Sequence, residues 1–468
     1  MRVTKSEAPV SAQLADFVAA LQRRDIPEHV QQDAGWRLVD TVGVALAGSR
    51  MDFAGAVRDV VAESGGRSEA TVLGFGDRLP APAAGFANAS LSHGPDYDDT
   101  HSVAMVHIGC LAVPAALAAA ERATATGSDM MVALVIGAEV GLRIGAAAPH
   151  RFHERGYHAT GVAGPFVAAT ATGKILRLEA GSIADALGLA GSQSAGLLEG
   201  LHDGSWVKRL HPAWSVQAGI TAALLAQKGF VGAKRVLEGE WGLYAVLLHG
   251  DEGPVEPGLV LDRLGESWLL PETTFKPYAC GAWNHSTMDA VASIMREERL
   301  VPQDIARIDA YVPSECVPLV CEPRAVKVRP QSVYHMKFSL PYSVAMLAVL
   351  GQAGVDDYTE ATLANPEIQS LASRVHCHAS PDLKPERFPA RVRLGTINGS
   401  SFERSVPAQR GGPRNPMSPE DHRHKFRANS VPCLGERRAE EALRLLEAAW
   451  DLDSLTDLMR MLVPADRS

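Results

Sequence analysis

The stretch LAVPAALAAAERATA, residues 111–125, decides the fold class of the chain. It is dense in alanine, the residue with the highest helix propensity, and Pro114 suits the first turn of a helix. The next residues, TGSD at 126–129, predict a helix end at Gly127 and a new N-cap at Ser128 or Asp129. Two helices joined so closely predict a packed helical hairpin.

The same helical periodicity of apolar residues extends on both sides of this hairpin, from residue 11 to about residue 265. Apolar residues recur at intervals of three and four, and single glycines separate segments of helix length. Gly173 is expected to end one helix, and Gly229 is expected to end the helix that begins near Trp214. These patterns predict an all-helical domain.

The periodicity of apolar residues changes after about residue 267. Segments 307–312 and 390–394 alternate polar and apolar residues with period two, which predicts strands of a smaller α/β unit. The residues SPED at 418–421 are typical of a helix start, and 437–461 returns to an amphipathic helical pattern. We therefore expect a mainly α protein with a helical domain over residues 1–267 and 413–468 and a smaller α/β domain over residues 268–412.

Composition and charge restrict the functional classes. The chain has 468 residues, of which 46% are hydrophobic and 21% are charged, so a disordered or fibrous protein is excluded. Its 45 Lys and Arg against 54 Asp and Glu give a formal charge of -9, without the basic excess that nucleic-acid binding requires. We expect no nucleic-acid partner.

The sequence also predicts a cytoplasmic protein. Its first residues lack the apolar run of a secretion signal. The most apolar window, 130–148, contains Glu139 and Arg143, which would be costly in lipid, so no membrane partner or span is expected. Six cysteines are scattered without a CxxC pair, which fits neither a disulfide framework nor a zinc ribbon.

The densest polar cluster of the helical half is SHGPDYDDTH, residues 92–101, with His107 six residues further on. Gly94 and Pro95 break the helix here, so the acidic and histidine side chains are expected on a loop or helix end, where a base can reach a ligand. A solvated acidic turn is the alternative, because short Asp-rich turns are common on surfaces. An EF-hand calcium loop does not fit, because the ligand spacing and the terminal glutamate are missing.

Two further segments place cations beside helix starts. RGYHATG, residues 155–161, precedes a small-residue helix, and KRLHP, residues 208–212, begins another. Cations at helix N-termini suit an anionic ligand. Alternatively, the cations of both segments are ordinary exposed surface residues. The histidines group with lysine and aspartate rather than with one another at metal-ligand spacing, and HCH at 376–378 has no third ligand beside it. We expect no metal site.

Five blocks, in order between residues 93 and 350, resemble the MmgE/PrpD family, whose members include 2-methylcitrate dehydratases, cis-aconitate decarboxylases and iminodisuccinate epimerases. The blocks read HGPDYDDTHSVAMVH, RGYHATGVAGPF, KRLHPAWSVQAGITAALLAQKGFVG, TFKPYACGAWNHSTMDA and KFSLPYSVAMLAVL. One such block alone is weak evidence, whereas five in the same order are strong.

The resemblance implies a large helical domain, a smaller α/β lid domain, a homodimer and an active site in the cleft between the two domains. Carried over by position, it implies catalytic roles for seven residues, which are Asp96, Thr100, His107, His158, Lys208, Lys276 and Tyr342. His285 matches a histidine that is frequent in the family and, with the cationic Arg155, is expected to bind the substrate.

The chemistries of the family share one problem, the creation of negative charge on a carbon next to a carboxylate. This needs a positioned base, for which His158 and His107 are candidates, and cations such as Lys208 and Lys276. Asp96 is expected to orient an imidazole or to act as an acid. No cofactor is required.

We therefore predict a cofactor-independent lyase, a hydratase or dehydratase of a di- or tricarboxylate related to 2-methylcitrate. An epimerase of the iminodisuccinate type is the alternative, and a binding protein that kept the fold without catalysis is a further one. The cis-aconitate decarboxylases place a histidine five residues after the lysine that Lys276 matches, where this chain has Gly281. That departure counts against decarboxylation.

Overall fold

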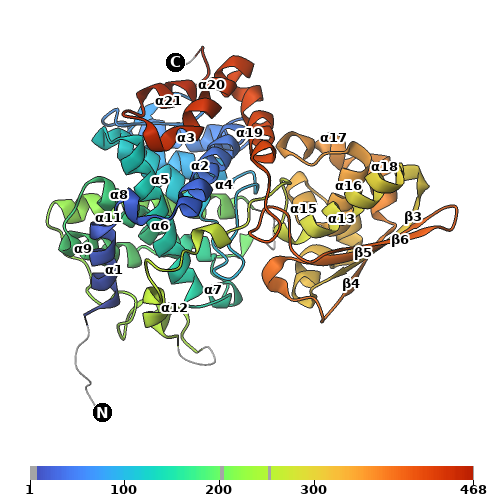
Figure 1. Cartoon of the computed structure of the whole chain (residues 1–468), viewed down its shortest axis with the longest axis horizontal. Helices are drawn as coiled ribbons and strands as arrows, with labels where there is room; N and C mark the ends of the chain where they lie inside the picture. The colour runs from blue at the N-terminus through green and yellow to red at the C-terminus, as the bar shows by residue number, and fades with distance from the viewer. Residues whose placement is uncertain (1–7, 201–204, 251–254, 467–468) are drawn as a thin grey trace. The chain divides into compact units, whose positions relative to one another are not determined.

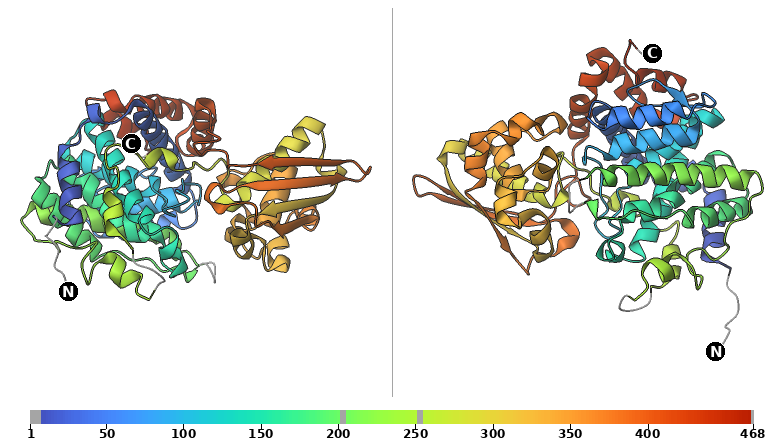
Figure 2. Two further views of the ribbon diagram at one scale, coloured as in Figure 1. Left: turned by 60° about the horizontal axis from the view of Figure 1, so that its bottom comes forward. Right: turned by 180° about the vertical axis from the view of Figure 1, so that it is seen from behind.

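The computed structural model describes residues 8–200, 205–250 and 255–466 and divides into two compact units (Figures 1 and 2). The first unit comprises Met1–Gly94, Val103–Thr273 and His422–Ser468, and the second comprises Pro95–Ser102 and Thr274–Asp421. The sequence places the domain boundaries at 267/268 and 412/413, whereas the structure divides the chain at 273/274 and 421/422. The structure also assigns residues 95–102 to the second unit, which no sequence pattern indicates.

In its described part, the first unit is helical apart from one β-hairpin. The hairpin pairs two short strands, β1 (Ala70–Thr71) and β2 (Arg78–Leu79), of two residues each. The α-helices of this unit are α1 (Val10–Ala20), α2 (Glu28–Gly48), α3 (Ala54–Glu63), α4 (Ala81–His93), α5 (Gly109–Ala123), α6 (Gly127–Ala146), α7 (Arg151–Glu154), α8 (Ala159–Ile175), α9 (Ala180–Gly191), α11 (Val207–Gln227), α12 (Leu243–Leu247), α19 (Pro419–Leu434), α20 (Glu436–Glu447) and α21 (Thr456–Met461). The predicted mainly α class is confirmed.

Helix α8 lies at the centre of this unit and packs against α5, α6, α9 and α11. Every residue of α8 except Lys174 is buried. Small residues allow the backbones to approach closely, since a Cβ at Gly219 of α11 would lie 2.3 Å from the carbonyl oxygen of Pro165 in α8. The alanine- and glycine-rich sequence thus forms a dense core rather than a surface helix.

The C-terminal helices pack back on the first unit. Helix α20 lies against α2, far from it in sequence (Figure 1). A buried ion pair joins Lys425 of α19 to Asp40 of α2, with 2.7 Å between Nζ and Oδ1. The amphipathic pattern over 437–461 forms two helices rather than one, because α20 ends at Glu447 and α21 begins at Thr456.

Several predicted helix boundaries are wrong. Helix α5 ends at Ala123 with Thr124 in the left-handed conformation, and the N-cap of α6 is Thr126, whose side chain accepts a hydrogen bond from the N–H of Asp129. Gly173 lies inside α8. Helix α11 ends before Gly229 as predicted but begins at Val207, seven residues before the predicted start. Local capping and packing, which periodicity does not report, decide these ends.

The second unit contains a four-stranded sheet in the order β4-β3-β5-β6. The strands are β3 (Ile305–Val312), β4 (Val375–Ala379), β5 (Ala390–Thr396) and β6 (Ser401–Val406); β3 is parallel to β4 and antiparallel to β5, and β5 is antiparallel to β6. The helices are α13 (Ala282–Glu298), α14 (Arg324–Val328), α15 (Val333–Lys337), α16 (Leu340–Leu350), α17 (Glu360–Leu363) and α18 (Pro366–Ala372). The predicted strands at 307–312 and 390–394 are confirmed.

Helices α13 and α16 cover one face of this sheet (Figure 2). Strand β5 alternates buried and more exposed side chains, as the period-two pattern predicts.

In the described part of the chain, no helix is long and apolar enough to cross a membrane.

Candidate active site

Four histidines and one lysine gather at the ends of four helices in the first unit. His93 ends α4, His107 lies two residues before α5, and His158 is the N-cap of α8. Lys208 is the second residue of α11 and His211 is the fifth. The ring centroids of His93, His107 and His158 are 4.8 to 5.7 Å apart, and that of His211 is 5.2 Å from His158. We call His93, His107, His158 and His211 the histidine cluster.

The cluster carries a positive electrostatic environment. Nζ of Lys208 lies 3.1 Å from Nε2 of His93. Helices α5, α8 and α11 all begin at the cluster, so their N-terminal N–H groups and dipoles add positive potential there. An anionic group such as a carboxylate suits this arrangement.

Burial and nearby charge lower the pKa of His158 and His211 and of the adjacent His153. His158 is fully buried, and burial, followed by Lys208, lowers its pKa well below the usual value of 6.5. Burial, His93 and Lys208 lower the pKa of His211 to about 4. The pKa of the adjacent His153 is likewise lowered to about 4, by burial, Lys208 and His150. Near neutral pH, His158 is therefore a proton acceptor beside an ammonium group.

One nitrogen of His158 is paired and the other is available. Nδ1 of His158 lies 3.0 Å from Nδ1 of His211. Nε2 of His158 is buried and has no hydrogen-bond partner among the described residues. The backbone N–H of His107 donates to Oγ1 of Thr160 at 3.1 Å, which fixes the start of α5 against α8.

The grouping of histidines differs from the sequence prediction. One nitrogen from each of His93, His107 and His158 lies within 4.8 Å of the others, a spacing that can hold a metal ion. The prediction that histidines do not group with one another is thus wrong, because helix ends distant in sequence converge. However, the ammonium of Lys208 contacts His93, and a dication would be repelled by it. The donor set fits an anion better than a metal.

A second group of charged residues lies in the second unit. Nζ of Lys276 is 3.4 Å from Oδ1 of Asp96 and donates a hydrogen bond to the Asp96 carbonyl at 3.0 Å. Both side chains are buried, and Asp96 has a left-handed backbone with φ of 56°. Thr100 pairs with Thr274 through two backbone hydrogen bonds of 2.9 Å. The structure thus pairs the predicted residues Asp96 and Lys276, and it pairs the backbone of Thr100 with Thr274, two residues before Lys276.

Lys337 is a buried cation of this unit that the sequence analysis missed. Its Nζ donates to the carbonyls of Pro95 at 2.7 Å and Ala279 at 2.9 Å, and it lies 4.4 Å from the ring centroid of Tyr358. Together with Lys276, it holds the backbone of residues 95–102 in the second unit. This explains why the segment belongs there.

The remaining predicted residues are placed differently. The hydroxyl of Tyr342 donates to the carbonyls of Thr362 at 2.7 Å and Leu363 at 3.0 Å, so it is used inside the second unit. His285 is fully buried, with Nε2 3.1 Å from the carbonyl of Cys280 and Nδ1 3.1 Å from Nε2 of Gln409. Arg155 is exposed just after α7. Tyr342 and His285 thus form hydrogen bonds with residues of the second unit.

Three residues of these groups were missed in the sequence, namely His93, His211 and Lys337. Each lies inside a quoted block, as the first histidine of HGPDYDD, the histidine of KRLHP and the lysine of KFSLPY. Their residue types were therefore a signal, but their convergence depends on tertiary packing.

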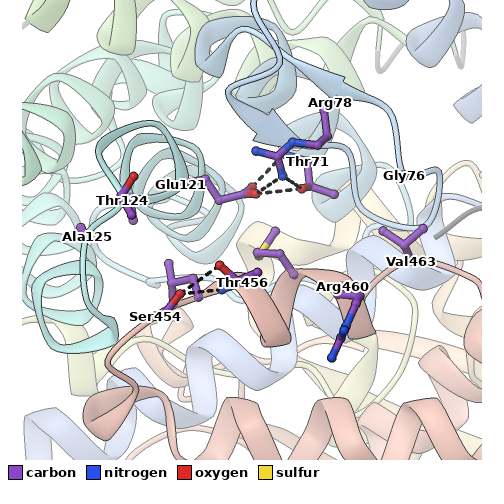
Figure 3. A pocket seen from close by; sticks show the side chains of 13 residues that line it. Thr71, Gly76, Arg78, Glu121, Thr124, Ala125, Ser454, Thr456, Arg460 and Val463 are labelled. Carbon is purple, nitrogen blue, oxygen red and sulfur yellow. Dashed lines mark hydrogen bonds and ion pairs between the residues drawn. The ribbon is translucent and has the colours of Figure 1, made fainter.

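A pocket elsewhere in the first unit is separate from the histidine cluster (Figure 3). It has a volume of about 450 Å³ and lies between the β1–β2 hairpin, the end of α5 and α21. Its polar groups bind one another, because Glu121 accepts hydrogen bonds from the side chains of Thr71 at 2.8 Å and Arg78 at 3.0 Å. None of its described lining residues is one of the predicted site residues.

Comparison with known proteins matches both halves of the chain to one protein family. Residues 12–255 match the MmgE/PrpD N-terminal domain, and residues 278–452 match the MmgE/PrpD C-terminal domain. The chain belongs to the MmgE/PrpD family. The resemblance seen in the five sequence blocks is thus confirmed.

Named relatives of this MmgE/PrpD chain match it over almost the full length. The cis-aconitate decarboxylase-like protein oryM of Aspergillus oryzae is 28% identical, covering 98% of this chain and 99% of that protein. The cis-aconitate decarboxylase of Aspergillus terreus is 28% identical, with coverages of 98% and 96%. That of Homo sapiens is 26% identical, with coverages of 97% and 94%. These lyase-type relatives support the prediction that this member of the family is an enzyme.

Proposed function

We propose that the protein is a cofactor-independent lyase that removes or adds water next to a carboxylate of a tri- or dicarboxylate. The observation that carries the proposal is the neutral, buried His158 in the same cluster as the ammonium of Lys208. A base that is unprotonated at neutral pH takes a proton from carbon, and a fixed cation stabilises the negative charge that then develops.

In this mechanism the available Nε2 of His158 accepts the proton from the carbon next to the carboxylate. The C–H electron pair remains on the substrate as an enolate-like anion, which Lys208 and the helix N-termini of the cluster stabilise. Hydroxide then leaves from the neighbouring carbon. Asp96 and Lys276 of the second unit are also proposed to take part in turnover, because they match the family blocks and are held as a buried ion pair.

The substrate class follows from charge. Three helix N-termini and Lys208 at the histidine cluster suit a carboxylate group. The relatives named for cis-aconitate, a tricarboxylate, support the same class. We therefore favour citrate-like and 2-methylcitrate-like compounds and their dehydrated forms.

Decarboxylation of cis-aconitate is a second candidate, because the named relatives carry that activity in their names and align over nearly the whole chain. Gly281 argues against it, since the decarboxylases resembled have histidine at that position. In this chain the N–H of Gly281 donates to the carbonyl of Lys337 at 2.9 Å, and a Cβ there would lie 3.3 Å from that oxygen. A histidine would require a shift of the Lys337 backbone.

The experiment is proton NMR in deuterated water with citrate, 2-methylcitrate, cis-aconitate and iminodisuccinate as separate probes. Appearance or loss of a vinyl proton signal with retention of all carbons supports a hydratase or dehydratase. Itaconate-like products with release of carbon dioxide would replace the proposal with decarboxylation, and interconversion of iminodisuccinate enantiomers would replace it with epimerisation. No change in any probe would contradict a lyase acting on this class.

A further inference from the structure

We propose that His211 is a positioning residue that holds the proton of His158 on Nδ1, so that Nε2 of His158 keeps the lone pair that takes a proton from the substrate. The catalytic role of His211 rests on the proposed function. The tautomer of His158 does not depend on that function. Neither the family match nor the five sequence blocks assign a role to His211.

The geometry requires a donor and an acceptor. The two Nδ1 atoms lie 3.0 Å apart, which is hydrogen-bonding distance. A neutral imidazole carries one proton on one of its two nitrogens, so one ring must donate through Nδ1 and the other must accept. If His158 donates, its Nε2 is a base; if His211 donates, Nε2 of His158 carries the proton and is an acid.

The surroundings of the two rings favour His158 as the donor. Nε2 of His158 is buried with no partner among the described residues, so a proton there would be a buried donor without an acceptor. His211 is partly exposed, so its Nε2–H can donate to water instead. The groups that face His158 include His93, His107, His153 and Lys208, and the charge of Lys208 adds to the effect of burial. That charge also disfavours a proton on Nε2.

A glycine holds the pair in place. The carbonyl of Gly196 accepts a hydrogen bond of 2.9 Å from the N–H of His158. A Cβ at Gly196 would lie 3.3 Å from Cγ and Nδ1 of His211, and its φ of +123° is strained for other residues. Gly196 therefore binds the backbone of His158 and leaves no room for a side chain beside the His211 ring.

The hydrogen bond also matters after proton transfer. The substrate proton moves to Nε2 of His158, the electron pair stays on the carbon, and the ring becomes an imidazolium with protons on both nitrogens. Its Nδ1–H then donates to the lone pair on Nδ1 of His211, which stabilises the cation without a second proton transfer. When the proton leaves Nε2 again, the starting tautomer is restored.

The kinetic test compares His211→Asn with His211→Leu in the full chain, using whichever of the four carboxylate probes the wild type converts. The amide oxygen of asparagine can take the place of Nδ1 as acceptor, whereas leucine cannot. We expect His211→Leu to lose about 10²-fold in kcat with little change in KM, and to shift the acid limb of the kcat profile to lower pH. His211→Asn should remain within about tenfold of the wild type without that shift. Equal losses in both variants, or no loss in His211→Leu, would overturn the role.

A second measurement does not depend on the substrate. Long-range proton–nitrogen NMR of protein labelled with ¹⁵N-histidine distinguishes the two neutral tautomers, and the His158 signals are assigned by their absence from His158→Gln. We expect the Nδ1–H form of His158 in the wild type and in His211→Asn, and a different tautomer population in His211→Leu. An Nε2–H form in the wild type would overturn the inference. If no probe is converted while the Nδ1–H form is found, the proposed function fails and the tautomer assignment stands.

Discussion

His158 and His211 face each other through their Nδ1 atoms, which lie 3.0 Å apart, although His158 is the N-cap of α8 and His211 lies near the start of α11. The contact leaves Nε2 of His158 as the nitrogen with no partner in the described structure. Since Lys208 contacts the neighbouring His93, a base and a cation occupy one buried cluster.

Lys208→Met should lower kcat by about 10²-fold or more, because a fixed cation that stabilises charge only in the transition state is lost. Lys208 also lowers the pKa of His211, so the same substitution should raise that pKa from about 4. Steady-state kinetics and proton NMR titration check the two effects. Lys228→Met, which removes an exposed lysine after the end of α11, is the control. A rise in KM with unchanged kcat would instead make Lys208 an anchor for the ground-state substrate.

Lys276→Met should abolish turnover and destabilise the fold by about 3 kcal/mol, since it leaves Asp96 as a buried carboxylate that has lost its cation 3.4 Å away. The double variant Asp96→Asn/Lys276→Met should regain part of this stability but no activity. Urea unfolding of the four proteins of this cycle gives the coupling energy. Purely additive losses of stability would show that the two side chains do not act as a pair.

Stability should fall as the pH drops from about 6.5 towards about 4. The pKa of His153 and of His211 is about 4 in the folded protein, and that of His158 is lowered as well, so the unfolded chain binds more protons in this window. Each histidine contributes a slope of at most about 1.4 kcal/mol per pH unit. Urea unfolding across this range measures the slope, and His153→Gln/His211→Asn should flatten it. An equally steep slope in the double variant would assign the acid sensitivity to other groups.

Exhaustive chelation should leave turnover unchanged, although His93, His107 and His158 are spaced closely enough for a metal. The reason is the ammonium of Lys208, 3.1 Å from His93, which opposes a dication. Rates measured before and after dialysis against EDTA provide the check. Activity lost in EDTA and restored by one divalent ion would assign the three histidines to a metal.

Periodicity was sufficient to predict the helical first unit and the strands of the second, because burial of one face imposes a repeat on the local sequence. It could not place the start of α11 at Val207 or the N-cap of α6 at Thr126, since single side chains decide helix ends. Nor could it assign residues 95–102 to the second unit. That assignment depends on Lys276 and Lys337 binding carbonyls distant in sequence.

The candidate site shows the same limit. The blocks identified His107, His158 and Lys208 by residue type, but not that His93 and His211 join them, because only the packing of α4, α5, α8 and α11 brings these helix ends together. Tyr342 matched a block as well, yet its hydroxyl binds two backbone carbonyls. A residue type that fits a motif does not report which partner the folded chain gives it.

The most direct test of the proposed function is exchange of the substrate proton with solvent. Wild type, His158→Gln and the control His29→Gln, an exposed histidine of α2, are each incubated with the converted carboxylate in deuterated water and followed by proton NMR. Glutamine cannot accept a proton near neutral pH, so His158→Gln should lose both exchange and turnover while His29→Gln retains them. Undiminished exchange in His158→Gln would contradict the assignment of His158 as the base.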